Sequence, residues 1–167
     1  MSYRVEKDIM VPMRDGVRLA TDAWIPDGDR PAPVLLVRLP YGKDMNGLYA
    51  YGLVPNVFTL VEAGYAVVYQ DGRGTFRSGG EFTPMVNEPG DGADTVAWLL
   101  AQPWCDGNIG TYGASYLGFV QWAIASAAAP VKAIAPAVTT TDYYSAPWYS
   151  EGGAAPCRCT RSRRGRR

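Results

Sequence analysis

The chain has 167 residues, of which 47% are apolar, and it carries 16 acidic and 16 basic side chains. This length can bury one hydrophobic core, and the absence of a run of about 18 apolar residues argues against a transmembrane helix. The first ten residues include Arg4, Glu6 and Lys7, which does not fit a signal peptide, so we expect a cytoplasmic protein.

Two features of the composition restrict the chemistry. The chain contains no histidine, and its three cysteines, Cys105, Cys157 and Cys159, have neither metal-site spacing nor the density of a disulfide framework. We therefore expect no metal and no cofactor. All six basic residues after Glu151 are arginines, so an acidic body is followed by a basic tail.

The predicted elements alternate between strands and helices. Asp15-Gly16 between two apolar segments predicts an antiparallel hairpin at the start. The other predicted strands are apolar runs, and the helices show apolar residues at helical spacing. The predicted strands are residues 11–13, 17–24, 33–38, 65–70, 109–112 and 131–135, and the predicted helices are residues 54–61, 91–100 and 115–129. This order predicts an α/β fold with a mostly parallel sheet.

Ser115 lies between a predicted strand and a predicted helix. A serine in that position is held in a sharp turn that lifts its hydroxyl above the sheet, as in the nucleophile elbow G-x-S-x-G. Gly113 fits this pattern, but Leu117 stands where the second glycine is expected, and Gly118 follows it. The pattern alone is equally compatible with a strand–helix turn that has no chemical role.

Three segments directly follow predicted parallel strands: the loop with Tyr41, the glycine-rich loop 72–80, and the turn at Ser115. Ligands of parallel sheets bind beyond the carboxyl ends of the strands, so these segments share one functional edge. The spacing of glycines in loop 72–80 and the absence of a following helix argue against a phosphate site there. Asp71 and Glu81 are better explained as acceptors that fix this loop than as a catalytic pair.

Seven ordered segments resemble one family of serine hydrolases, which includes bacterial cocaine esterases, X-Pro dipeptidyl-peptidases and α-amino-acid ester hydrolases. The resemblance covers roughly residues 3–155, and the family's own elbow, S-Y-x-G, matches Ser115 to Gly118. The segments are residues 10–19 (MVPMRDGVRL), 38–41 (RLPY), 70–74 (QDGRG), 78–82 (SGGEF), 104–108 (WCDGN), 113–118 (GASYLG) and 146–149 (APWY).

The resemblance implies the N-terminal half of an α/β-hydrolase core in residues 1–138 and the start of a helical lid insertion in residues 139–155. It also implies acyl transfer from a small-molecule ester or amide through Ser115. The phenol of Tyr41 and the backbone N–H of Tyr116 would form the oxyanion hole, and Trp148 would be an aromatic wall of the acyl pocket. The resemblance leaves open whether full-length relatives form homo-oligomers, and whether the activity is that of an X-Pro dipeptidyl-peptidase.

The chain departs from this family in one decisive respect. The family activates its serine with a histidine that an aspartate orients, and both lie far downstream of the serine. No histidine is present here, and the match stops near Ala154. We therefore expect a truncated or frameshifted fragment with little activity, whose residues 156–167 form a disordered basic tail.

A non-catalytic binding fragment is the main alternative. Its basic tail could bind nucleic acid or another acidic surface. The tail has no interleaved aromatic residues, and a shifted reading frame in GC-rich DNA tends to encode arginine. We therefore expect no nucleic-acid partner and no membrane association.

Overall fold

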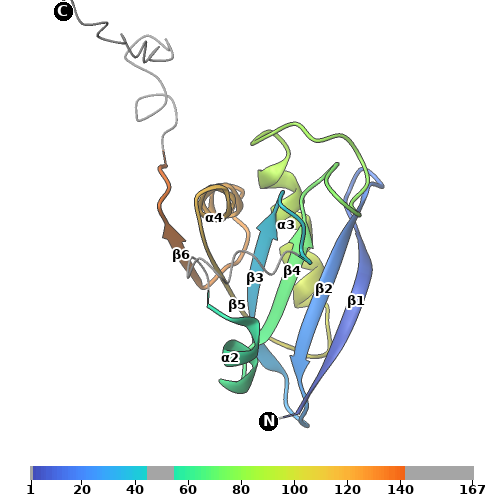
Figure 1. Cartoon of the computed structure of the whole chain (residues 1–167), viewed down its shortest axis with the longest axis vertical. Coiled ribbons are helices and arrows are strands. Elements are labelled where there is room, and N and C mark those ends of the chain that lie inside the picture. Colours follow the sequence, from blue (N-terminus) through green and yellow to red (C-terminus); the bar gives the residue numbers. More distant parts are fainter. Residues whose placement is uncertain (1, 45–54, 142–167) are drawn as a thin grey trace, which may run out of the picture.

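The computed structural model describes residues 2–44 and 55–141, and its elements follow the predicted order (Figure 1). The strands are β1 (Tyr3–Pro12), β2 (Arg18–Pro26), β3 (Ala32–Leu39), β4 (Ala66–Asp71), β5 (Cys105–Ala114) and β6 (Ala133–Ala137). The helices are α2 (Val57–Glu62), α3 (Glu88–Leu100) and α4 (Tyr116–Ser126). The predicted lid beyond residue 141, Trp148 and the tail 156–167 lie outside the described residues.

The described strands form one sheet in the order β1-β2-β4-β3-β5-β6. β1 pairs antiparallel with β2, and β2 pairs antiparallel with β4. The pairs β3–β4, β3–β5 and β5–β6 are all parallel. The prediction of a mostly parallel sheet with an antiparallel start is therefore confirmed.

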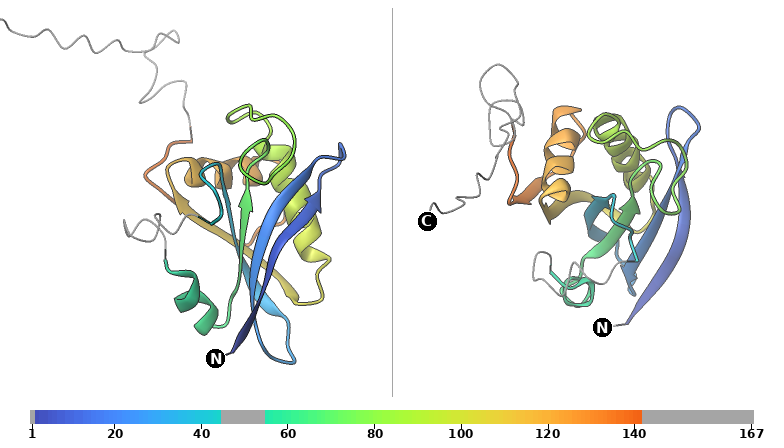
Figure 2. Two further views of the ribbon diagram at one scale, coloured as in Figure 1. Left: turned by 45° about the vertical axis from the view of Figure 1, so that its right-hand side comes forward. Right: turned by 45° about the horizontal axis from the view of Figure 1, so that its top comes forward.

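Helices cover both faces of this sheet. α3 and α4 pack against each other on one face, and α2 lies on the opposite face (Figure 2). Val96 and Leu99 of α3 and Ile124 of α4 join the largest hydrophobic cluster, whereas Val57 and Val61 of α2 join a second cluster on the other face. The central strands are buried from both sides, which explains their continuous apolar runs.

Several element boundaries differ from the sequence prediction. The largest difference is in β1, which begins at Tyr3 rather than at residue 11, because residues 3–6 pair with residues 23–26 of β2. Three other differences have clear causes. β5 begins at Cys105 rather than at residue 109, because its first residues extend along β3, where Cys105 pairs with Ala32. α3 begins at Glu88, with a proline in its first turn, where the missing N–H costs nothing. α4 ends at Ser126, three residues before the predicted end, and Ala128 then takes a left-handed conformation with φ 55°.

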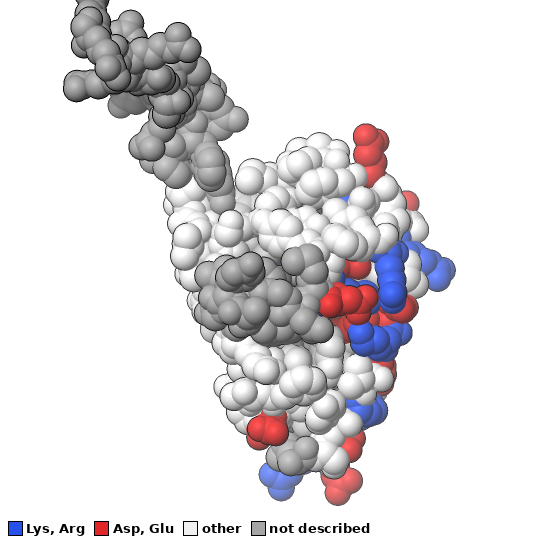
Figure 3. All heavy atoms as spheres, viewed as in Figure 1, with Lys and Arg blue, Asp and Glu red and all other residues white. Residues whose placement is uncertain are grey.

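β6 is the outer strand on one side of the described sheet, and its residues alternate between exposed and half-buried. Charged side chains on the face shown in Figure 3 gather toward β1 and β2, and the part near α4 and β6 shows almost none. Within the described residues, no helix combines the length and apolar character needed to cross a membrane.

Candidate active site

The turn between β5 and α4 holds Ser115 in a conformation that few side chains adopt. Its φ is 58° and its ψ is −121°, and this strain is typical of a functional turn. Two glycines make room for it: a Cβ on Gly113 would lie 2.6 Å from Leu117 Cβ, and one on Gly118 would lie 2.6 Å from Thr139 Cγ2. The obstacle at Gly118 is therefore chiefly the segment after β6, with the carbonyl of Ala137 next.

The backbone of Ser115 is fixed while its side chain remains exposed. Its N–H donates to Ala137 O at 2.9 Å, and its carbonyl accepts from the N–H groups of Gly118 and Phe119. The hydroxyl makes no capping hydrogen bond to α4, although Ser115 occupies the N-cap position. A hydroxyl that is held above the sheet and has no capping role is available for chemistry, as the elbow pattern predicts.

Tyr116 is the first residue of α4, so its backbone N–H has no acceptor in a preceding helical turn. Its phenol donates to Glu88 Oε1 at 3.0 Å and accepts from the N–H of Met85 at 3.0 Å. Burial and the neighbouring Glu88 carboxylate raise the pKa of the Tyr116 phenol well above its ordinary value. Tyr116 is thus held at its hydroxyl, while its backbone N–H faces no helical acceptor.

Tyr41 lies just beyond the carboxyl end of β3, with 39% of its surface exposed. Its ring lies edge-on to that of Tyr116, at 6.4 Å between centroids. The structure therefore brings Tyr41 to the same edge of the sheet as Ser115 and Tyr116, as predicted. Trp148, the fourth predicted site residue, lies outside the described residues.

Lys43 anchors the segment that carries Tyr41. Its backbone N–H donates to Asp71 Oδ1 at 2.6 Å, and its buried ammonium donates to Asp8 and lies 2.8 Å from an oxygen of Asp22. Gly42, with φ 95°, lies so close to the Phe76 ring that a Cβ would contact it at 2.9 Å. These contacts fix the backbone at Lys43, two residues after Tyr41, and so restrict where Tyr41 can lie.

The polar groups of the glycine-rich loop 72–80 form hydrogen bonds within the loop and with the neighbouring strands β2 and β4. Gly74 N–H donates to Gly79 O, Gly79 N–H donates to Arg18 O, and the hydroxyl of Ser78 donates to Asp71 O. Asp71 accepts from the backbone at Lys43, as expected of a loop-fixing acceptor, whereas Glu81 makes no side-chain hydrogen bond within the described part of the chain. The loop is therefore a structural support at this edge.

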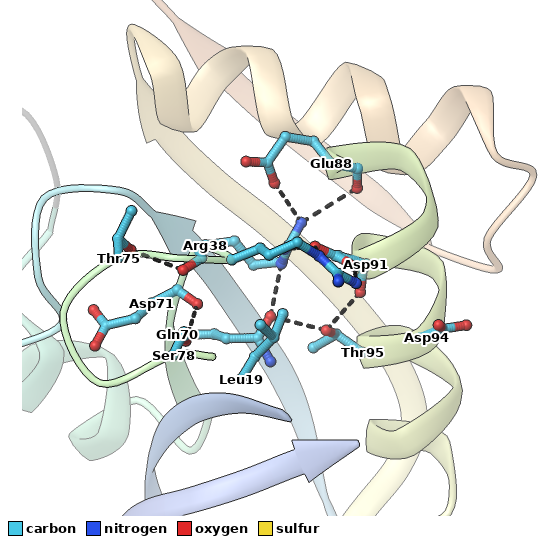
Figure 4. A network of polar contacts seen from close by, with 12 residues as sticks. Leu19, Arg38, Gln70, Asp71, Thr75, Ser78, Glu88, Asp91, Asp94 and Thr95 are labelled. Atoms are coloured by element: carbon cyan, nitrogen blue, oxygen red, sulfur yellow. Dashed lines mark hydrogen bonds and ion pairs between the residues drawn. The ribbon is translucent and has the colours of Figure 1, made fainter. Parts of the chain in front are cut away.

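A buried polar network lies beneath the elbow, and the sequence analysis did not identify it (Figure 4). Arg38 of β3 donates to Glu88 Oε2 at 2.7 Å and to Gln70 Oε1 at 2.7 Å. Thr95 of α3 also donates to Gln70 Oε1, and Asp91 lies 3.8 Å from Arg38. The available signal was a charged residue at the end of the apolar run 33–38, which a buried strand tolerates only with partners.

Gln121 joins α4 to the strands on either side of the elbow. Its amide N–H groups donate to the carbonyls of Gly113 and Leu117 at 3.1 Å, and its oxygen accepts from Ala135 N–H at 2.8 Å. β5, α4 and β6 are thus linked through one buried side chain. This link restricts the orientation of α4, and with it the direction of the Tyr116 N–H.

Comparison with known proteins identifies the family. Residues 15–160 match the X-Pro dipeptidyl-peptidase family S15. The chain belongs to this family. It is 52% identical, over 155 residues, to the cocaine esterase of Rhodococcus sp. (strain MB1 Bresler), a match that spans 92% of this chain and 27% of that esterase. It therefore covers about a quarter of the length of this relative.

Solved structures of hydrolases share the fold. A CocE/NonD family hydrolase from Staphylococcus aureus superimposes with a TM-score of 0.72 and 33% identity, over 80% of this chain and 27% of that one. An α-amino-acid ester hydrolase gives a TM-score of 0.72 at 28% identity, over 90% of this chain and 28% of that one. The described residues therefore form part of an α/β-hydrolase fold, as the sequence analysis predicted.

Proposed function

We propose that this S15 chain carries the nucleophile and the oxyanion donors of a serine hydrolase that cleaves esters or amides. Ser115 Oγ attacks the substrate carbonyl carbon, and the hydroxyl proton passes to a base. The bond from that carbon to the leaving alcohol or amine then breaks, and the leaving group takes up the proton. Water hydrolyses the acyl-serine ester and restores the hydroxyl.

The observation that carries this proposal is the conformation of Ser115. Its exposed side chain stands at a left-handed turn, next to the backbone N–H of Tyr116, which has no acceptor among the described residues, and the Tyr41 ring lies 6.4 Å from the Tyr116 ring. The tetrahedral intermediate places negative charge on the former carbonyl oxygen. Preorganised N–H and O–H donors at that position stabilise this charge, and the loss of one donor typically costs about 100- to 1,000-fold in rate.

Ester cleavage is the favoured activity, because the relative with 52% identity is named a cocaine esterase and a structural neighbour is named an α-amino-acid ester hydrolase. The family description supports X-Pro dipeptide release as the second candidate. A small acyl ester and an X-Pro p-nitroanilide, offered in parallel, separate the two. Faster acylation of Ser115 by the p-nitroanilide than by the ester would make X-Pro dipeptide release the favoured activity.

The 167 residues contain no histidine to accept the proton of Ser115. The loss of a triad base typically lowers kcat by about 10⁴ to 10⁶. We therefore expect p-nitrophenyl acetate turnover by this chain to be close to that of its Ser115→Ala variant. Strong turnover that depends on Ser115 would show that another group serves as the base.

The nucleophile can be tested without the missing histidine. Imidazole in the buffer supplies a diffusible base, and a p-nitrophenyl phosphonate ester labels an activated serine: the Oγ–P bond forms, p-nitrophenolate leaves, and imidazole takes the proton. Peptide mapping by mass spectrometry should place the label on Ser115, with none in Ser115→Ala. We expect Tyr41→Phe to slow labelling at least about tenfold. Labelling no faster than in the urea-unfolded chain would refute the proposal.

A further inference from the structure

The hydroxyl of Tyr116 is held from two directions, although the proposed chemistry uses only the backbone N–H of this residue. Glu88 accepts from it at 3.0 Å, and Met85 donates its N–H to it at 3.0 Å. Met85 reaches this position with φ 67°, a conformation that costs a non-glycine residue energy. The fold therefore fixes the far end of the residue whose near end adjoins Ser115.

Glu88 can hold Tyr116 because Arg38 fixes the carboxylate itself. Arg38 donates to Glu88 Oε2 at 2.7 Å and to the Glu88 carbonyl at 3.2 Å (Figure 4). The other carboxylate oxygen, Oε1, accepts from the Tyr116 phenol. The side chain of Arg38 is fully buried, and that of Glu88 is 8% exposed. Hydrogen bonds to charged groups in such surroundings are short and directional.

Close packing of the helices transmits this constraint to the elbow. A Cβ on Gly92 of α3 would lie 2.3 Å from Ile124 Cγ1 of α4, so the two helices meet where only glycine fits. The ring of Tyr116 also packs against Phe119 and Phe82, at 5.9 Å and 6.5 Å between centroids. The first turn of α4 cannot shift without breaking the contact with Glu88.

We propose that Glu88, oriented by Arg38, is a positioning residue for the oxyanion hole. It holds the Tyr116 phenol and thereby aims the Tyr116 backbone N–H at the oxygen of the reacting group. This inference rests on the proposed function, because it concerns the N–H beside the nucleophile Ser115. A displacement of about 1 Å in such a donor can cost about 100-fold in rate.

The test uses the phosphonate labelling of Ser115 with imidazole in the full chain. Tyr116→Phe removes the hydroxyl and keeps the ring. The pair variant Arg38→Met/Glu88→Leu removes the acceptor and leaves no unpaired charge in the core. Arg14→Met/Asp94→Asn is the matched control, because it removes another pair between an arginine and a carboxylate of α3, and this pair does not touch Tyr116. Circular dichroism establishes that each variant folds.

We expect Tyr116→Phe and the pair variant each to slow labelling by about 10- to 100-fold at saturating phosphonate, with an unchanged half-saturating concentration. The combination of both changes should be no slower than either alone, because both break the same contact. The control pair should label at the wild-type rate. A merely structural role of Glu88 would instead lower thermal stability without this shared loss of rate.

Nuclear magnetic resonance of tyrosine enriched with ¹³C at Cζ provides a signature that does not depend on the phosphonate reaction. At neutral pH the Cζ signal of Tyr116 should move in the pair variant relative to the unmodified chain, because the hydrogen bond from its phenol to the Glu88 carboxylate is lost. Wild-type labelling by the pair variant, or multiplying effects in the combined variant, would overturn the positioning role alone. An unlabelled Ser115 in the unmodified chain would overturn both proposals.

Discussion

Two charged clusters support the two proposed oxyanion donors, and they differ in their access to water. The elbow network (Arg38, Gln70, Glu88, Asp91 and Thr95) lies beneath Tyr116, and its residues are buried. The bulge cluster (Lys7, Asp8, Asp22, Lys43, Asp44 and Arg77) lies beside the segment of Tyr41, where the β1–β2 register shifts between Glu6 and Ile9. Charged residues of this second group reach the surface, on the side of β1 and β2 (Figure 3).

The two clusters compensate their buried charges for the loss of water in different ways. Arg38 has no solvent access, so its hydrogen bonds to Glu88 and Gln70 must replace water. Lys43 is equally buried, but its partner Asp8 is 44% exposed, and Lys7 also lies 3.0 Å from the buried Asp22. The buried Asp22 of the bulge cluster therefore has two cations, Lys43 and Lys7, whereas Glu88 of the elbow network has only Arg38 among the described residues. Asp91 of the elbow network also pairs with Arg73, at 2.6 Å, so the contrast concerns Glu88.

The largest effect should follow the loss of Arg38 alone. Arg38→Met leaves the Glu88 carboxylate buried without its cation, and we expect a loss of about 3 to 5 kcal/mol in the free energy of unfolding. Urea unfolding followed by tryptophan fluorescence measures it. The pair variant Arg38→Met/Glu88→Leu should recover most of this loss, since neither charge then remains. A pair variant as unstable as Arg38→Met would show that the cost comes from packing instead.

Replacement of Lys43 should cost less, although this side chain is just as buried. Lys43→Met leaves Asp22 with Lys7 still 3.0 Å away, so we expect a loss of about 2 kcal/mol in the free energy of unfolding. The exposed Lys132→Met serves as the control, with little expected change. A greater loss of unfolding free energy for Lys43→Met than for Arg38→Met would contradict the idea that Lys7 compensates Asp22 when Lys43 is absent.

The sequence predicted the elements and the edge that carries the site, because both depend on local patterns. Apolar runs mark the strands, and Gly113, Ser115 and Gly118 mark the turn; Gly113 is required by its close neighbour Leu117, although Gly118 is required by the more distant Thr139. Neither charged cluster could be predicted. Arg38 and Glu88 are 50 residues apart, and their pairing depends on how α3 packs against β3. Spacing within one segment holds no information on such a contact.

The same limit applies to Tyr116. The resemblance to the family pointed to its backbone N–H, which belongs to the elbow, and gave no reason to expect anything of its phenol. The phenol is fixed by Met85 and Glu88, from the loop before α3 and from its first residue. The predicted start of α3 at residue 91 also placed Glu88 outside the helix. Because the predicted start was three residues too late, the prediction gave no reason to connect Glu88 with Tyr116.

The smallest effect should appear in the response of the bulge cluster to acid. Hydrogen bonds from Lys43 and Arg77 lower the pKa of the half-exposed Asp8 from 3.8 to about 2. Because the folded pKa lies below the unfolded one, this carboxylate stabilises the fold fully above about pH 5. The contribution is lost progressively as the pH falls through about 2, and Asp8 is protonated in both states only below that. The melting temperature of the chain should therefore fall over this range.

Asp8→Asn tests this contribution at little cost to the backbone. The φ of Asp8 is 55°, a left-handed conformation that asparagine adopts readily. The variant should melt below the unmodified chain at pH 7, and the gap should narrow as the pH approaches 2. Asp29→Asn, at an exposed aspartate without an ion pair in the described part of the chain, should leave the acid response unchanged. A gap that stays constant from pH 7 to pH 2 would mean that Asp8 acts through its backbone geometry and not through its charge.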